Sequence, residues 1–158
     1  MNVSVEGRLA AEDRPPLADA CPIERASEIL ARRSTLVLLR EASYGTRRFD
    51  DFVRRSGLTE SVVAAQLRAL VAEGLLAKRD YRERGQRTRA EYVLTAAGDD
   101  LVPILLALAQ WGDRHRPRGH RLRMTHTGCG ADLDPVLRCE AGHTITVDEV
   151  TVGLMKGE

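Results

Sequence analysis

The segment Leu58–Thr95, LTESVVAAQLRALVAEGLLAKRDYRERGQRTRAEYVLT, decides the fold of this chain. Its first half carries apolar residues at positions i, i+4, i+7 and i+8, which share one face of a helix. These residues are Val63, Leu67, Leu70 and Val71. Thr59 is suited to begin the helix, and Gly74 is suited to end it. The spacing therefore predicts an amphipathic helix between these two residues.

The second half of the segment predicts a β-hairpin. Residues 75–81 and 90–94 have strand character, and the residues between them, RERGQRTR, are rich in arginine. An antiparallel hairpin with a cationic tip beside a short helix is a recurring way of binding nucleic-acid phosphates. The alternative is an ordinary helix and hairpin whose charges meet only solvent.

The residues before this segment predict three further helices. CPIERASEILARRSTLVLLREASYG, residues 21–45, contains two helical segments separated near Arg33-Ser34, and Pro22 suits a first helical turn. TRRFDDFVRRSG then predicts a short helix, and Gly57 begins a tight turn into the helix described above. Helix, tight turn and helix form a helix-turn-helix, whose second helix can enter a major groove about 12 Å wide.

The charge of the chain is unevenly distributed. The 158 residues carry a net charge of +1, but residues 21–95 hold fifteen Lys and Arg against ten Asp and Glu, a net of +5. Residues 1–20 have a net charge of −2 and residues 124–158 a net charge of −4. The positive excess is therefore greatest in the region of the helix and hairpin, as expected if that region meets a polyanion.

The two ends of the chain differ from its middle. Residues 1–20 include two adjacent prolines and no apolar period, which predicts a flexible arm. Residues 118–158 are rich in Gly, Thr and Val, which predicts short strands and turns. The expected fold class is thus mainly α (α+β): a winged helix-turn-helix domain over residues 21–117 with a small C-terminal strand-and-turn extension.

Neither a membrane span nor a secretory signal is evident. No apolar run approaches the roughly 20 residues needed to cross a bilayer, and the N-terminus lacks a basic segment followed by an apolar one. We therefore expect no membrane partner and a cytoplasmic location. The three cysteines are widely spaced and odd in number, so a stable disulfide framework is not expected.

Double-stranded DNA is the expected partner of the helix and hairpin. Arginines before and within the first helix of the helix-turn-helix suit phosphates, polar residues of the second helix suit base edges, and the hairpin suits phosphates or an adjacent minor groove. The predicted DNA-binding residues are Arg47, Arg48, Arg54, Arg55, Thr59, Ser61, Ala65, Gln66, Arg68, Arg84, Gln86, Arg87 and Arg89.

The last predicted helix has a wide apolar face. Thr95 is suited to cap it, and apolar residues follow at helical intervals with few charges between them. These residues are Leu101, Ile104, Leu105, Leu108 and Trp111. A terminal helix with so wide an apolar surface predicts contact with a second chain, the alternative being contact with the chain's own C-terminal tail.

Four segments together resemble the HxlR-type winged-helix transcriptional regulators, which are relatives of the MarR type. They are CPIERASEIL, TLVLLREASYGTRRFDDF, LRALVAEGLL and EYVLTAAGDDLVPILLALAQWGDRH, and the resemblance covers about Cys21–His115. Two positions depart from the family pattern. Ser34 stands where the family usually has tryptophan, and the hairpin tip lacks the more frequent proline.

The resemblance implies a homodimer on a pseudo-palindromic operator. Family members pair through the first and last helices of the domain, which adds Ile23 and Ile29 to the expected interface. Several members use a cysteine at the position matching Cys21 as an oxidant sensor. The competing interpretation is that this cysteine is a small buried residue at the dimer interface.

The C-terminal extension contains two pairs of soft metal ligands. His126 and Cys129 form the first pair, and Cys139 and His143 form the second. A tetrahedral zinc ion takes four such ligands, so these residues are candidates for a structural zinc site in a ribbon-like element. The resembled family's domain needs no metal, and no other cofactor is expected.

The sequence favours a dimeric, sequence-specific DNA-binding transcriptional regulator, a repressor responsive to a small molecule or an oxidant. The alternative is a winged-helix module that binds another protein without sequence-specific DNA binding. An enzyme is not expected, because no nucleophile-base pair, phosphate loop or paired-carboxylate spacing is found in the chain.

Overall fold

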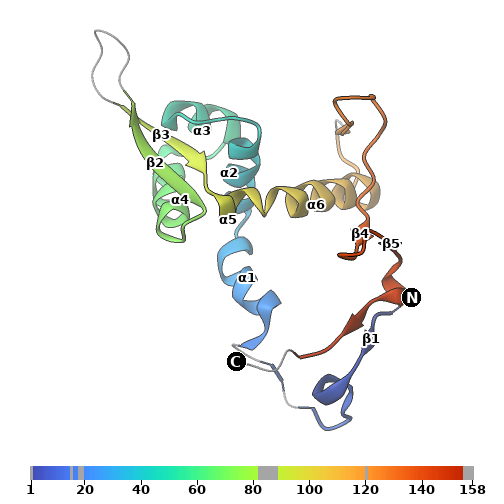
Figure 1. Ribbon diagram of the computed structural model, residues 1–158. Coiled ribbons are helices and arrows are strands. Elements are labelled where there is room, and N and C mark those ends of the chain that lie inside the picture. The colour runs from blue at the N-terminus through green and yellow to red at the C-terminus, as the bar shows by residue number, and fades with distance from the viewer. Residues whose placement is uncertain (1, 15, 18–19, 82–88, 120, 155–158) are drawn as a thin grey trace. The chain divides into compact units, whose positions relative to one another are not determined.

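The computed structural model describes residues 2–14, 16–17, 20–81, 89–119 and 121–154. The chain divides into two compact units (Figure 1). One unit consists of Asp19–Arg121, and the other joins Met1–Ala18 to Leu122–Glu158.

The unit Asp19–Arg121 contains six helices and one hairpin within its described residues, and it places α2, α3 and α4 against β2 and β3 (Figure 1). Its helices are α1 (Pro22–Leu30), α2 (Arg33–Ser43), α3 (Phe49–Ser56), α4 (Glu60–Ala72), α5 (Ala96–Asp99) and α6 (Val102–His115). Its strands are β2 (Leu76–Tyr81) and β3 (Arg89–Leu94), which pair antiparallel with Leu76 opposite Leu94.

The core of this unit lies where α2, α3, α4 and β2 meet. Leu38 and Leu39 of α2 are fully buried, and so is Phe52 of α3, whose ring meets Tyr92 edge-on with centroids 6.2 Å apart. From α4 come Val63, Leu67 and Leu70, the stripe that the sequence predicted. Each such side chain stabilises the fold by about 1.5–3 kcal/mol on burial.

Two turns with left-handed glycines set the position of α4. Gly57, with φ of 66°, separates α3 from α4, and Gly74, with φ of 71°, ends the helix. The Leu75 N–H then donates to the Leu70 carbonyl over 2.9 Å and leads directly into β2. Glycine adopts this conformation at little cost, whereas other L-residues are strained there.

The last predicted helix is divided in two. Thr95 caps the short helix α5, accepting a hydrogen bond from the Gly98 N–H at 3.2 Å, and α6 begins only at Val102. The expectation of one helix running from Thr95 is therefore wrong. Pro103 is the physical reason, because proline has no N–H to continue the helix and is tolerated only in a first turn.

The unit formed by the two chain ends is built from short strands. β1 (Ser4–Val5) pairs in parallel with β6 (Thr151–Val152), and β4 (Leu137–Arg138) pairs antiparallel with β5 (Thr144–Ile145). The single-turn helices η1 (Gly7–Ala10) and η3 (Val147–Glu149) complete it. Within the segment that its composition predicted to be a flexible arm, the N–H groups of Ser4 and Glu6 bond to the backbone of Val150 and Val152.

The helix η3 has a reciprocal cap. The backbone N–H and the hydroxyl of Thr146 both donate to the Glu149 carboxylate, at 2.7 and 3.0 Å. The hydrogen bond from the Thr146 backbone, followed by that from its hydroxyl, lowers the pKa of Glu149.

Among the described residues, no helix has both the length and the apolar character that crossing a bilayer requires.

Candidate nucleic-acid interface

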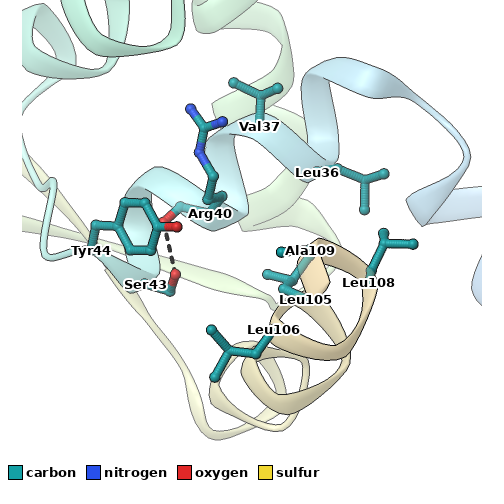
Figure 2. A pocket seen from close by; sticks show the side chains of 9 residues that line it. All are labelled: Leu36, Val37, Arg40, Ser43, Tyr44, Leu105, Leu106, Leu108 and Ala109. Atoms are coloured by element: carbon teal, nitrogen blue, oxygen red, sulfur yellow. Dashed lines mark hydrogen bonds between the residues drawn. The ribbon is translucent and has the colours of Figure 1, made fainter. Parts of the chain in front are cut away.

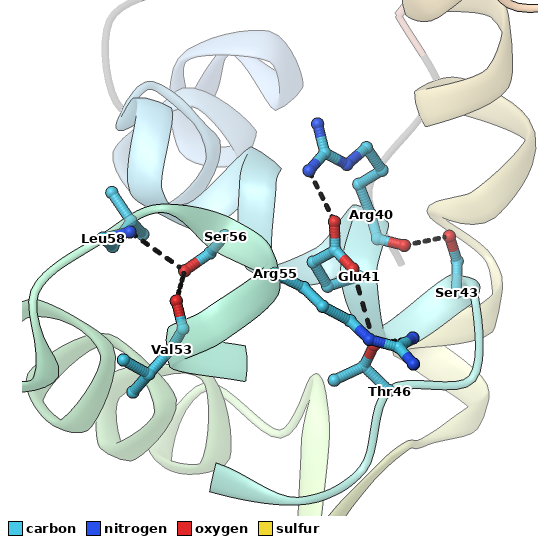
Figure 3. Close-up of polar contacts among 8 residues, drawn as sticks. All are labelled: Arg40, Glu41, Ser43, Thr46, Val53, Arg55, Ser56 and Leu58. Carbon is cyan, nitrogen blue, oxygen red and sulfur yellow. Dashed lines mark hydrogen bonds and ion pairs between the residues drawn. The ribbon is translucent and has the colours of Figure 1, made fainter. Parts of the chain in front are cut away.

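Helices α3 and α4 form a helix-turn-helix with a stabilised turn. The Leu58 N–H donates to the Ser56 hydroxyl at 3.2 Å, and that hydroxyl donates to the Val53 carbonyl at 3.5 Å (Figure 3). Ser56 is itself buried. These contacts and the left-handed Gly57 orient α4 relative to α3, so that one face of α4 packs in the core and the other faces solvent.

The solvent face of α4 is small, and it carries a single charged residue within its middle turns. Ser61, Ala65 and Arg68 are exposed at positions i, i+4 and i+7. Val62 lies beside them and is 40% exposed. Such a face can approach base edges closely, with apolar side chains against thymine methyl groups. Sequence reasoning missed Val62, although it falls off the core stripe.

Gln66 faces the core and not the solvent. It is only 8% exposed, and its Nε2 donates to the Thr35 hydroxyl at 2.7 Å. The Ser34 hydroxyl lies 3.3 Å from its Oε1. This geometry does not favour the prediction that Gln66 contacts base edges, because the side chain is almost buried and both ends of its amide have partners inside the domain.

Thr59 begins α4, as predicted, but its hydroxyl does not cap the helix. The hydroxyl lies 3.2 Å from that of Ser61, and it makes no hydrogen bond to the first backbone N–H groups of α4. Both residues are exposed. A helix N-terminus favours an anionic group, so Thr59 lies where a phosphate would be stabilised.

The four arginines around α3 have partners within the chain. Arg54 forms an ion pair with Asp51 one turn away, and Arg47 Nη1 lies 3.9 Å from Glu91 Oε2 on the hairpin. Arg55 Nη1 donates to the Thr46 hydroxyl at 3.2 Å. Arg48 immediately precedes α3 and is bridged through its backbone to the strand residue Glu91. All four residues remain exposed, which suits contact with phosphates.

The hairpin is attached to the helix-turn-helix through its backbone. The Tyr92 N–H donates to the Arg47 carbonyl at 2.8 Å, so strand β3 lies beside the loop that leads into α3. The described part of the hairpin exposes Lys78, Arg79 and Arg89. The first two were missed by sequence reasoning, which looked for cations only at the tip. Arg84, Gln86 and Arg87 lie outside the described residues.

A buried carboxylate connects α2 with α3. Glu41 is 6% exposed and accepts from Arg40 Nη2 at 2.5 Å and from the Thr46 hydroxyl at 3.4 Å (Figure 3). Thr46 is also buried, and it is the residue to which Arg55 of α3 donates. Because a buried charge is stable only with such partners, this network fixes α3 relative to α2. No sequence signal pointed to it.

Helices α1 and α6 present an apolar surface to solvent. Ile23 is 78% exposed, Ile104 56% and Trp111 55%, and Leu108 is exposed beside them. The remaining members of the predicted dimer interface, Ile29, Leu101 and Leu105, are partly buried against the core. Of the seven residues predicted to form the dimer interface, four are therefore exposed to solvent and three pack partly against the core of the same chain.

Cys21 immediately precedes α1. It is half-buried, it has no disulfide, and its side chain makes no capping hydrogen bond to the helix. The position at the start of the helix is as expected from Pro22, which occupies the first turn.

The predicted zinc ligands form two separate pairs. His126 Nδ1 lies 3.2 Å from Cys129 Sγ in one turn, and Cys139 Sγ lies 3.6 Å from His143 Nδ1 in the turn between β4 and β5. Within the described ranges, no three His, Cys, Asp or Glu side chains are grouped closely enough to hold a metal ion. The arrangement of the described side chains therefore does not support a shared tetrahedral site.

Comparison with known proteins agrees with this geometry. The chain is 39% identical over 132 residues to the HTH-type transcriptional regulator Rv3095 of Mycobacterium tuberculosis, covering 82% of each protein. It is 29% identical to the HTH-type transcriptional regulator YybR of Bacillus subtilis, over 64% of this chain and 80% of that protein.

Two solved structures are similar along much of the chain. PA1607, described as a candidate transcription factor, superposes with a TM-score of 0.73 at 26% identity and covers 86% of this chain and 96% of its own. The oxidised form of the redox regulator HypR superposes with a TM-score of 0.55 at 30% identity, over 61% and 98% of the two chains. These relatives are transcriptional regulators and not enzymes.

The profile of the HxlR-like helix-turn-helix family matches residues 29–120, which include α2, α3, α4, the hairpin and α6. The chain belongs to this family and is a transcriptional regulator with a helix-turn-helix.

Proposed function

We propose that this regulator binds a specific DNA sequence through the solvent face of α4 and through the hairpin. The observation that carries the proposal is the exposed face of Ser61, Val62, Ala65 and Arg68, which lies on a rigidly held helix. Small side chains allow the helix to enter the major groove, and Arg68 supplies a donor suited to guanine. The cations around it suit phosphates, which position a protein without reading sequence.

The functional unit is a homodimer formed through α1 and α6. The exposed apolar residues Ile23, Ile104, Leu108 and Trp111 support this, because large apolar side chains gathered on two neighbouring helices are seldom left in water. Two copies related by a twofold axis place two α4 helices on one duplex, so the operator is a pseudo-palindrome.

The regulator acts as a repressor whose DNA affinity responds to a small molecule or to an oxidant. The relative HypR is a redox regulator with known oxidised and reduced structures. Cys21 is a half-buried thiol at the start of α1. Oxidation there would alter the helix that borders the proposed dimer surface. Diamide treatment of the protein and of Cys21→Ser, followed by DNA binding and crosslinking measurements, tests this response.

Selection of bound duplexes from a random pool, followed by gel-shift titration, tests the DNA-binding proposal. We expect a symmetric site, and we expect Arg68→Ala to relax the preference at one base pair of each half-site by about 1–3 kcal/mol. Arg25→Ala, an exposed arginine on α1, is the matched control and should retain the preference. An unselective pool after several rounds would contradict the proposal.

The second candidate function is a protein-interaction module. The exposed Val62 and Ala65 on α4 favour it, since apolar surface also suits a protein partner. Salt distinguishes the two functions, because log affinity for DNA falls steeply and linearly with log salt concentration. Absence of salt-sensitive retention of duplex DNA would support the protein-interaction module.

A further inference from the structure

Thr46 is a buried residue that connects a carboxylate in the domain to an arginine at its surface. It lies in the loop between α2 and α3 and is only 3% exposed. Its hydroxyl donates to Glu41 Oε2 at 3.4 Å and accepts from Arg55 Nη1 at 3.2 Å (Figure 3). Arg55 itself is exposed in the last turn of α3. The three side chains therefore form a chain of hydrogen bonds that ends at an exposed guanidinium.

The chemistry of the three groups fixes the direction of these hydrogen bonds. A threonine hydroxyl has one proton, a carboxylate only accepts, and a guanidinium only donates. The hydroxyl proton of Thr46 is therefore directed to Glu41, and a lone pair of the same oxygen is directed to Arg55. Glu41 thus orients the hydroxyl as an acceptor for the arginine, although it makes no direct contact with Arg55.

The backbone around Thr46 is fixed on both sides. The Thr46 N–H donates to the Glu41 carbonyl of α2 at 3.0 Å. The carbonyl of the next residue, Arg47, accepts from the Tyr92 N–H of β3 at 2.8 Å. Because the hydroxyl belongs to a loop attached to both a helix and a strand, it offers Arg55 an acceptor at a fixed position.

The charge of Glu41 is balanced by a different arginine. Arg40 Nη2 donates to Glu41 Oε1 at 2.5 Å, while Thr46 contacts the other carboxylate oxygen. Arg40 lies on the side of α2 that faces α6, and its carbonyl accepts from the Ser43 hydroxyl at 2.7 Å (Figure 2). Since Arg40 pairs with the carboxylate and Arg55 is held by a neutral hydroxyl, Arg55 keeps its positive charge for another partner.

Arg55 differs in this respect from two other arginines near α3. Arg54 forms an ion pair with Asp51, and Arg47 Nη1 lies 3.9 Å from Glu91 Oε2. A phosphate must compete with a carboxylate for either of these guanidinium groups, whereas a hydroxyl presents no competing charge. A guanidinium has five N–H donors, so a single bond to a hydroxyl leaves donors for the oxygens of a phosphate.

We propose that Thr46 is a positioning residue for DNA binding, which holds the Arg55 guanidinium ready for one phosphate of the duplex. In a helix-turn-helix the first helix crosses the DNA backbone, and α3 is that helix. An arginine that is ordered before binding loses less conformational entropy when it binds. The inference rests on the proposed function, because it assigns one phosphate contact of the same surface.

Thr46→Val tests the positioning, because it removes the hydroxyl and keeps a branched side chain. Fluorescence anisotropy measures the affinity for a duplex of mixed sequence at several salt concentrations. We expect a loss of roughly two- to tenfold, as for ordering one long side chain on binding. The salt slope should stay unchanged, because Arg55 still neutralises its phosphate. Arg55→Met should instead lower the slope by about one, and Thr46→Ser, which keeps the hydroxyl, should retain the affinity.

A double-mutant cycle separates positioning from a purely structural role. Thr46→Val should cause no further loss of affinity in the Arg55→Met background, because the side chain that it positions is absent. Arg54→Met is the matched control background, in which Thr46→Val should keep its full effect. A role of Thr46 in the fold alone would weaken DNA binding equally in both backgrounds. Circular dichroism checks that each variant is folded.

Side-chain relaxation NMR of the unaltered chain without DNA measures the anchoring directly. The Nε–H of Arg55 should be more ordered than that of Arg25, an exposed arginine on α1. Equal mobility of the two, equal effects of Thr46→Val in both backgrounds, or a salt slope altered by Thr46→Val would overturn the positioning. Absence of salt-sensitive duplex binding by the unaltered chain would instead contradict the proposed function, and the mobility of Arg55 would still decide whether Thr46 holds it.

Discussion

Gln66 shows how the role of one residue depends on its neighbours in space. It follows Val63 by three positions and precedes Leu70 by four, so helical spacing alone places it on the core face. Its polarity suggested a base contact, and its partner Thr35, 31 residues earlier in the chain, had no visible connection to it. Helical spacing predicted the position of Gln66 better than its polarity did, because a polar side chain is stable in the core once it has a hydrogen-bond partner.

Gln66→Ala is expected to destabilise the fold without changing sequence preference. The substitution leaves the buried Thr35 hydroxyl without its partner, which costs about 1–3 kcal/mol of unfolding free energy. Urea denaturation measures this loss. Ser61→Ala, on the exposed face of the same helix, should do the reverse, altering base preference with little effect on stability. If Gln66→Ala changed the preference for DNA sequence and Ser61→Ala did not, Gln66 would again be the candidate for a DNA contact.

Gly98→Ala is expected to lower the stability of the domain by about 1–3 kcal/mol, as overpacking commonly does. A Cβ at this position would lie 2.2 Å from the Leu75 carbonyl oxygen, which belongs to the backbone and cannot rotate away. Thermal unfolding monitored by circular dichroism measures the effect. Gly112→Ala in α6 is the matched control, because a Cβ there meets no atom within 4 Å. A melting temperature for Gly98→Ala equal to that of the unaltered chain would contradict the close approach.

At the scale of elements, periodic segments were predictable and short ones were not. The stripe of α4 and the paired strands β2 and β3 follow from repeated spacing, since many residues report the same face. The two-residue strands β1 and β6 carry no such signal, and they pair across nearly the whole chain. Their pairing is decided by tertiary contacts that no local pattern contains.

In the candidate DNA-binding site, too, some residues could be predicted from the sequence and others could not. The exposure of Ser61, Ala65 and Arg68 could be read from the helical period, whereas Lys78 and Arg79 required the register of the hairpin. The Glu41 network joins α2 and α3 through one turn, and its members look like ordinary surface residues in the sequence. Contacts made across elements therefore account for most of what sequence reasoning missed.

The hairpin is expected to contribute affinity but not sequence preference. Replacing Lys78 and Arg79 together by alanine should weaken binding to all duplexes and reduce the salt slope by about one for each phosphate that the variant no longer neutralises. Fluorescence anisotropy at several salt concentrations measures both quantities. The control is Arg25→Ala, which removes an exposed charge from α1. An unchanged slope would place the strands of the hairpin away from the phosphates.

At the scale of the whole molecule, the apolar surface of α1 and α6 is expected to hold two copies together. Ile104→Glu places a charge within that surface and should convert a dimer into monomers, because a desolvated charge without a partner is unfavourable. Sedimentation velocity measures the mass. Arg114→Glu carries the same new residue on an exposed position of α6 and should leave the mass unchanged. A monomeric parent chain would contradict the proposed dimer at once.

The parallel pairing of β1 with β6 also has a consequence during synthesis. Ser4 and Val5 are synthesised 147 positions before their partners Thr151 and Val152, as the pairing register shows. At roughly 5–20 residues per second, the first strand waits on the order of ten seconds for its partner. The last residue of Asp19–Arg121 is synthesised 30 positions before Thr151. The nascent chain can therefore begin to form its helix-turn-helix while its first strand is still unpaired.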